Sequence, residues 1–107
     1  MPKYVHKYYV YLLASKKDGV LYLGRTKDIE DRTLKHKTEK YKNAFSQRYQ
    51  TKKLVYFEEF QWVQDSIARE AKLKKWKREW KIALIEKDNP EWLDLAEAWW
   101  DEENFLE

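Results

Sequence analysis

The chain has 107 residues, a length typical of one domain, and a formal net charge of +3. It contains no cysteine, which excludes disulfides and thiolate zinc sites, and no apolar run of the roughly 18 residues that a membrane-spanning helix needs. The opening residues Met1–Tyr4 lack the apolar core of a signal peptide, so we expect one cytoplasmic domain, residues 1–107, without a membrane partner.

The charge is distributed unevenly along the sequence. Residues 1–80 hold 20 Lys and Arg against 10 Asp and Glu, a net charge of +10. Residues 81–107 hold 2 against 9, a net charge of −7. A basic body with an acidic end suits a polyanionic partner, although a solvated lysine-rich surface would give the same pattern.

The predicted elements begin with an antiparallel hairpin. Two aromatic and β-branched runs, Tyr8–Ala14 and Val20–Gly24, flank a turn at residues 15–19 that ends in Asp-Gly. Side chains alternate between the two faces of a strand, so Tyr11 is expected on the opposite face to Leu12.

A helix is predicted next, from Ile29 to about Lys40, with Asp28 as its N-cap. It has few apolar residues, while Arg32 and His36 stand one turn apart on the same face. Two cationic groups in this arrangement do not stabilise each other, and such local costs tend to mark functional sites. The polar stretch Tyr41–Lys53 indicates a loop.

The second half of the chain predicts one strand and three helices. The strand is Leu54–Phe60, and the helices are Ser66–Lys77, with Asp65 or Ser66 as its cap, about Glu79–Lys87, and Glu91–Trp100. The order β-β-α-β-α-α plus a C-terminal helix predicts an α+β fold: a small, three-stranded, mostly antiparallel sheet flanked by helices. Its core is expected at about residues 8–92, followed by an acidic C-terminal helix and tail, 93–107.

Two tyrosine motifs and the residues that follow them suggest a function. Tyr9-Val10-Tyr11 lies in the first strand and Tyr22-Leu23-Gly24 in the second, with Arg32 ten residues after Tyr22 and His36 four further on. Tyrosine, arginine and histidine are residue types that can act on a phosphodiester. If these sites converge in space, a nuclease is indicated.

In these motifs the chain resembles the GIY-YIG nuclease superfamily, with Tyr9 in place of the family's first glycine. Arg32 and His36 match the family's Arg and His, and Glu70, in Ala68-Arg69-Glu70, matches its metal-binding glutamate. The resemblance covers about residues 8–92. It is strongest to small stand-alone bacterial members, through the stretches Leu54–Glu58 and Asn89–Trp92.

The resemblance implies a DNA endonuclease that depends on a single divalent ion, Mg²⁺ or Mn²⁺. Glu70 would bind the ion, since one carboxylate suits Mg²⁺, which keeps several waters. A helical wheel places Glu70 between Ile67 and Leu73, inside an apolar sector where an unpaired charge is costly. The alternative is an ion pair with Lys74, one turn further on.

The resemblance also implies roles for the other motif residues. Arg32 would bind the scissile phosphate, unless it pairs with Asp28, and His36 would orient or deprotonate a partner. Tyr11 or Tyr22 would activate the attacking water, although a phenol with a pKa near 10 is a poor base. Both tyrosines would be explained equally well as buried aromatic residues with satisfied hydroxyls.

Further residues are weaker candidates. Tyr9, Gly24 and Asn89 are possible site residues, each with an ordinary structural explanation: core packing, the end of a strand, and a helix stop before Pro90. Phosphate contacts are expected from basic side chains that would bind DNA without reading its sequence. These are Arg25, Lys37, Arg48, Lys72 and Lys75.

The sequence contains no zinc finger or helix-turn-helix, so low sequence specificity is expected, or specificity from branched or damaged DNA or from a protein partner. This activity would suit DNA repair or recombination. Two other classes remain open: a non-catalytic nucleic-acid-binding module on the same fold, and a small protein-interaction domain that uses the aromatic, acidic C-terminal end.

Overall fold

The computed structural model of the chain describes residues 7–37 and 51–100, without the side chains of residues 35–37, 98 and 100. Its three strands form one antiparallel sheet in the order β2-β1-β3, with the first strand of the chain in the middle. The strands are β1 (Tyr8–Ala14), β2 (Leu21–Thr26) and β3 (Lys53–Phe60). The predicted α+β class and three-stranded sheet are therefore confirmed.

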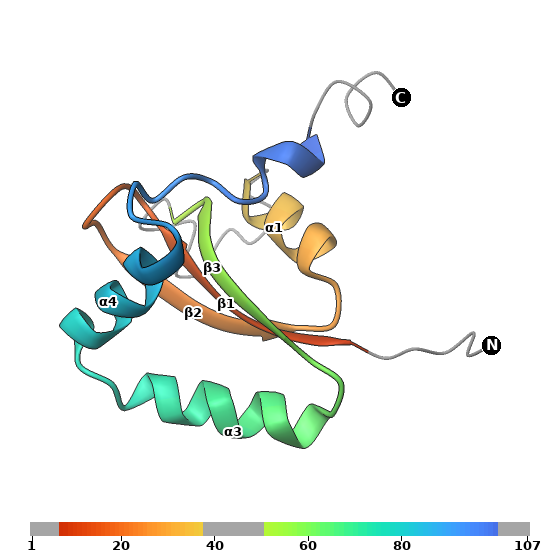
Figure 1. The fold of residues 1–107 in the computed structure, drawn as a ribbon. Helices are drawn as coiled ribbons and strands as arrows, with labels where there is room; N and C mark the ends of the chain where they lie inside the picture. The colour runs from red at the N-terminus through yellow and green to blue at the C-terminus, as the bar shows by residue number, and fades with distance from the viewer. Residues whose placement is uncertain (1–6, 38–50, 101–107) are drawn as a thin grey trace.

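Helices cover both faces of this sheet. They are α1 (Ile29–Lys37), α3 (Val63–Lys74), α4 (Arg78–Asp88) and a short 3₁₀ helix, η1 (Glu97–Trp100). Figure 1 shows the sheet between α3 and α4 on one side and α1 with the C-terminal segment on the other. None of the helices within the described residues is both long and apolar enough to span a bilayer.

The hydrophobic core has two parts, one on each face of the sheet. On the α1 side, Tyr11 and Leu13 of β1 pack with residues of β3, α1 and the C-terminal segment. On the other side, Leu12 and Ala14 pack with β3, α4 and the segment after α4. The alternation predicted for the first strand is thus confirmed, and it directs consecutive residues of β1 into different halves of the core.

The helix α1 begins where the sequence predicts. The backbone N–H of Asp28 donates to Thr26 Oγ1 at 3.1 Å, and the Asp28 carboxylate accepts the N–H of Asp31 at 3.0 Å, which is an N-cap. The buried Thr33 hydroxyl donates to the carbonyl of Ile29 at 2.8 Å. These bonds, with Ile29 in the core, fix the start of α1 against the end of β2.

The predicted cap of the next helix was wrong. α3 begins at Val63, immediately after β3, with Trp62 in the N-cap position and no side-chain capping bond. Asp65 lies in the first turn, and the Ser66 hydroxyl donates to the Val63 carbonyl at 2.7 Å. The helix also ends earlier than predicted, at Lys74, because the sharp connection to α4 starts there.

The predicted helix Glu91–Trp100 was also wrong, except for the single 3₁₀ turn of η1. Trp92 has a left-handed backbone, with φ of 57°, which an α-helix cannot accommodate. The residues after Trp92 form hydrogen bonds with β3 instead. The backbone N–H of Leu95 donates to the carbonyl of Leu54 at 2.7 Å, and the N–H of Leu54 donates to the side-chain Oδ1 of Asp94 at 3.2 Å. Tertiary contacts therefore override helix propensity here.

Candidate active site

Tyr11 and Tyr22 meet on the α1 face of the sheet, over Gly24. Tyr11 is fully buried and pairs with Gly24 in the register of β1 and β2. The two rings lie 6.2 Å apart between centroids, tilted by 36°. A Cβ on Gly24 would lie 2.5 Å from the Tyr11 hydroxyl oxygen and 2.9 Å from a ring carbon of Tyr22. Because Gly24 has no side chain, it leaves the space above β2 that the rings of Tyr11 and Tyr22 occupy.

Arg32 of α1 completes this group, which we call the Tyr–Arg cluster (Tyr11, Tyr22 and Arg32). The Tyr11 hydroxyl is hydrogen-bonded to both Arg32 and Tyr22. Burial is the main cause that raises the pKa of Tyr11 well above its usual value, with a further contribution from Tyr22, while Arg32 lowers it. Tyr11 is therefore neutral at physiological pH and can donate a hydrogen bond, and burial disfavours the phenolate form that a base would need.

Glu70 lies on the other face of the sheet. Its Oε1 is 3.4 Å from Nε of Arg25, the residue after Gly24, whose side chain points away from Tyr11 because strand residues alternate. Its Oε2 is 3.8 Å from Nζ of Lys74, so the ion pair offered by the helical spacing is present as well. The Glu70 side chain is 20% exposed. Ile67, however, is 47% exposed, so the predicted apolar sector around Glu70 is incomplete.

Five of the predicted site residues therefore form two groups that flank the edge strand β2. The Tyr–Arg cluster covers one face at Gly24, and the Arg25–Glu70 pair covers the other. Because residues 24 and 25 are neighbours in the chain, the two groups lie back to back on opposite faces of the same strand. Of the five predicted catalytic residues, the structure brings Tyr11, Tyr22 and Arg32 together and places Glu70 on the opposite face of the sheet, and the side chain of His36 lies outside the described residues.

A single divalent ion is compatible with this arrangement. Within residues 7–37 and 51–100, no three His, Cys, Asp or Glu side chains come together as a metal site. Mg²⁺ is commonly held by one or two carboxylates and completes its shell with water and substrate phosphate. The partly exposed carboxylate of Glu70 fits that mode, and Arg25 and Lys74 would compete with the ion for it.

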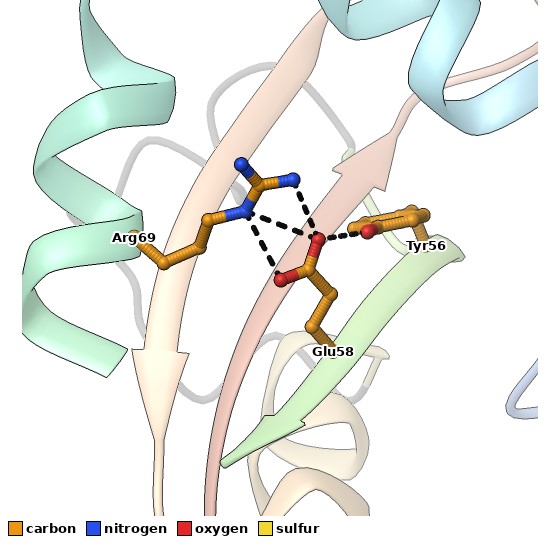
Figure 2. A network of polar contacts seen from close by, with 3 residues as sticks. All are labelled: Tyr56, Glu58 and Arg69. Carbon is orange, nitrogen blue, oxygen red and sulfur yellow. Dashed lines mark hydrogen bonds and ion pairs between the residues drawn. The ribbon is translucent and has the colours of Figure 1, made fainter. Parts of the chain in front are cut away.

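The structure also shows an ionic network that the sequence analysis missed. Glu58 of β3 accepts hydrogen bonds from Arg69 of α3 at 2.8, 3.0 and 3.1 Å, and from the Tyr56 hydroxyl, as Figure 2 shows. Burial, followed by Glu58, raises the pKa of Tyr56, and the bond to Glu58 raises the pKa of Arg69. The signal in the sequence was an acidic residue at an inward-facing position of a strand.

The remaining candidates have varied environments. His36 and Lys37 lie in the last turn of α1, but their side chains, like all of Arg48, are outside the described residues. Lys72 and Lys75 are exposed at the end of α3.

Tyr9 and Asn89 both make contacts that support the fold. Tyr9 packs edge-on against Phe57 with the ring centroids 6.1 Å apart. The side-chain amide of the buried Asn89 donates to the carbonyls of Val55 and Leu93 at 3.1 and 3.0 Å, and its oxygen accepts the Leu93 N–H at 2.9 Å. These bonds hold the segment after α4 against β3.

Known proteins match most of this chain. Residues 7–83 match the family model described as the GIY-YIG catalytic domain. A UPF0213 protein of Syntrophus aciditrophicus is 39% identical over 85 residues, which cover 79% of this chain and 95% of that protein. A UPF0213 protein of Staphylococcus saprophyticus is 38% identical over 84 residues, covering 74% and 94% respectively.

A solved structure is also similar. The solution NMR structure of a UPF0213 protein from Bacillus halodurans is 28% identical, with a TM-score of 0.49, and the match covers 78% of this chain and 86% of that one. The family match includes the whole Tyr–Arg cluster and the Arg25–Glu70 pair, whereas Asn89 lies beyond its end.

Proposed function

Because the chain belongs to the GIY-YIG family, whose catalytic domain its residues 7–83 match, we propose that it is a metal-dependent DNA endonuclease. The observation that carries this proposal is the crossing of Tyr11 and Tyr22 over Gly24, with Arg32 bonded to Tyr11. Core packing alone does not require an arginine at a buried phenol. A glycine that makes room for this contact favours a site for chemistry.

The Tyr–Arg cluster would act on the phosphodiester from the α1 face. A guanidinium carries five N–H donors, so Arg32 can hold Tyr11 and also donate to a phosphate oxygen. Tyr11, kept neutral by burial, would orient Arg32 and Tyr22. Tyr22 is only half-buried, so it is the phenol that would contact the attacking water. His36, four residues after Arg32 on α1, stays the residue predicted to orient or deprotonate a partner.

Glu70 would hold the single divalent ion, Mg²⁺ or Mn²⁺, on the α3 side of β2. Such an ion, when bound, neutralises charge on the phosphoryl oxygens and lowers the pKa of a coordinated water. Arg25 would move from Glu70 to the phosphate backbone as the ion and DNA bind. Its distance of 3.4 Å from Glu70 is that of a weak, partly exposed pair, which costs little to break.

DNA would be held mainly through its backbone. Exposed Lys72 and Lys75 extend the cationic surface of α3 beyond Glu70, and Lys37 and Arg48 are predicted to add to it. Backbone contacts carry no sequence information, so low intrinsic specificity is proposed, with a role in DNA repair or recombination. A cytoplasmic location and a partner that supplies specificity stay predictions.

The test is cleavage of supercoiled plasmid and of branched DNA with and without Mg²⁺ or Mn²⁺. Wild-type protein should nick DNA only with metal, and Glu70→Gln and Arg32→Ala should lose this activity. Glu59→Gln is a matched control, because Glu59 is an exposed carboxylate that pairs with Lys7 at 3.6 Å. Equal nicking by wild type and Glu70→Gln would mean that a contaminant cleaves the DNA, and the proposal would fail.

A non-catalytic DNA-binding module is the second candidate, because both Glu70 oxygens already face cations. In that case Arg25 and Lys74 would neutralise Glu70 permanently, and no ion would bind. DNA binding without cleavage in either metal, together with no heat of Mn²⁺ binding, would favour this candidate.

A further inference from the structure

Few residues of the helix that carries Glu70 are fully buried. Ser66 and Leu73 are the buried residues of α3, and the former is polar. Ile67, the aliphatic residue one turn before Glu70, is half exposed. Leu73 is the one fully buried apolar residue of α3, so apolar packing fixes the rotation of this helix about its axis mainly at one position. Other contacts must therefore determine where Glu70 points.

Charged residues on the sheet provide such contacts. Arg25 of β2, Val10 of β1 and Glu58 of β3 lie directly opposite one another in the strand register, so they form one row across the sheet. Consecutive residues of α3 bind the two ends of this row. Arg69 binds Glu58 on β3, and Glu70 binds Arg25 on β2. Figure 2 shows Arg69 reaching from α3 to Glu58.

The two ion pairs, Arg69–Glu58 and Arg25–Glu70, differ in strength. Arg69 meets both Glu58 oxygens at 2.8–3.1 Å, with about a fifth of each side chain exposed. Arg25 and Glu70 are separated by 3.4 Å. A bidentate arginine–carboxylate pair fixes orientation as well as distance, whereas a single longer contact does not. The Arg69–Glu58 pair therefore fixes α3 to β3. The Arg25–Glu70 pair is weaker, so another ligand can replace Arg25 at Glu70.

Two aromatic residues hold the Arg69–Glu58 ion pair in place. The Tyr56 hydroxyl donates to Glu58, and the Arg69 guanidinium lies over the Trp76 ring, 5.3 Å from its centroid. Both contacts restrict the rotamers of the ion pair and limit its access to water. The network thus contains a carboxylate, a guanidinium and two aromatic rings from β3, α3 and the turn after α3.

We propose that Glu58, Arg69 and Tyr56 are positioning residues, and we call these three residues the clamp. The clamp sets the rotation of α3 about its axis and thereby holds the Glu70 carboxylate at β2, beside Arg25. Consecutive helix residues are about 100° apart around the axis, so fixing Arg69 fixes the direction of Glu70. None of the three clamp residues needs to touch the ion or the DNA. The link to catalysis rests on the metal role proposed for Glu70.

The first experiment follows the Arg25 side-chain Nε–H signal by ¹⁵N NMR. Glu70→Gln defines the position of this signal when the pair is broken, and Arg25→Lys assigns it. In Glu58→Gln the signal should move toward its Glu70→Gln position, although the substituted residue lies two strands away. In Glu59→Gln, on the same strand, it should stay at the wild-type position. An unmoved signal in a folded Glu58→Gln protein would overturn the proposal.

The second experiment measures Mn²⁺ binding by titration calorimetry. Residues that orient a metal ligand typically change affinity by roughly 10- to 100-fold when substituted, so about a 10-fold loss is expected in Glu58→Gln. Arg69→Lys keeps the charge but lacks the planar fork, so it should weaken Mn²⁺ binding in the same direction. It also preserves the test if Glu58→Gln fails to fold. Glu59→Gln should bind like wild type.

The outcomes separate the two proposals. If Glu58→Gln abolished binding as completely as Glu70→Gln while Arg69→Lys left it intact, Glu58 would be a metal ligand and the positioning role would be wrong. If wild-type protein bound no Mn²⁺ and cleaved no DNA, the nuclease proposal would fail. The NMR comparison would still decide whether the clamp sets the position of Glu70.

Discussion

The Tyr11 phenol lies so close to Gly24 on the neighbouring strand that a Cβ there would be 2.5 Å from its hydroxyl oxygen. This contact depends on the register of β1 and β2, which pairs the two residues directly. Tyr11 is buried and bonded to Arg32 and Tyr22, so it has little freedom to move aside. The glycine of the second motif is thus required by the tyrosine of the first.

Gly24→Ala is therefore expected to destabilise the fold and to displace the Tyr–Arg cluster. Overpacking in a buried site typically costs about 1–3 kcal/mol, and DNA nicking should fall along with stability. Urea unfolding and a plasmid assay would measure the two effects. Lys27→Ala, at a nearby exposed position, should stay within about 0.5 kcal/mol of wild type. Wild-type stability in Gly24→Ala would contradict the close contact.

Tyr11→Phe removes one hydroxyl and keeps the ring. The loss of its bonds to Arg32 and Tyr22 should cost about 1 kcal/mol, with a larger effect on cleavage than on folding, because Arg32 loses its orientation. Single-turnover cleavage at saturating metal would measure this separately from DNA binding. Unchanged cleavage would limit Tyr11 to a core role, which was the alternative from the sequence.

High pH should destabilise the protein through Tyr11 and Tyr56. The pKa of each is raised in the folded state, above the usual value of 10.0 that applies when the chain is unfolded. Their contribution to the free energy of unfolding is fully present below about pH 10 and is lost as the pH rises toward the folded pKa. Urea unfolding between pH 9 and pH 11 should show a steeper fall for wild type than for Tyr11→Phe or Tyr56→Phe. Parallel curves for all three proteins would refute this.

Asn89→Ala should separate a structural asparagine from a catalytic one. It removes three hydrogen bonds to the backbone, one to the buried carbonyl of Val55 and two to partly buried groups of Leu93, and a buried group left unsatisfied costs about 1–3 kcal/mol. We expect a clear loss of thermal stability with cleavage retained well below the melting temperature. Asp88→Ala, at an exposed neighbour, should change neither property. Lost cleavage in a folded Asn89→Ala protein would support a role in the site.

Arg25→Gln should strengthen metal binding and weaken DNA binding. Removing a cation 3.4 Å from Glu70 should tighten Mn²⁺ binding about two- to fivefold, since partly exposed pairs are worth less than about 1 kcal/mol. DNA binding should weaken and become less dependent on salt, because one phosphate contact is lost. Calorimetry and fluorescence anisotropy would measure these. Weaker binding of both ligands would contradict the competition.

Local sequence patterns predicted much of the fold correctly. The hairpin, its alternation, the Asp28 cap and the strand at Leu54–Phe60 follow from interactions between near neighbours, and the structure confirms them. The Glu91–Trp100 helix was wrong because Leu95 and Asp94 bond to Leu54, about 40 residues away. Helical periodicity carries no information about such a partner.

The sequence by itself determined which residue types face each side of the sheet, because the period of a strand places Tyr11 and Leu12 on opposite faces wherever the strand packs. It also determined that Glu70 lies in a helix with a cation one turn away. The tertiary structure alone decided that Gly24 makes room for Tyr11, and that Arg69 grips Glu58 while Glu70 faces Arg25. These relationships depend on strand register and helix rotation, which are set by contacts between residues far apart in the chain.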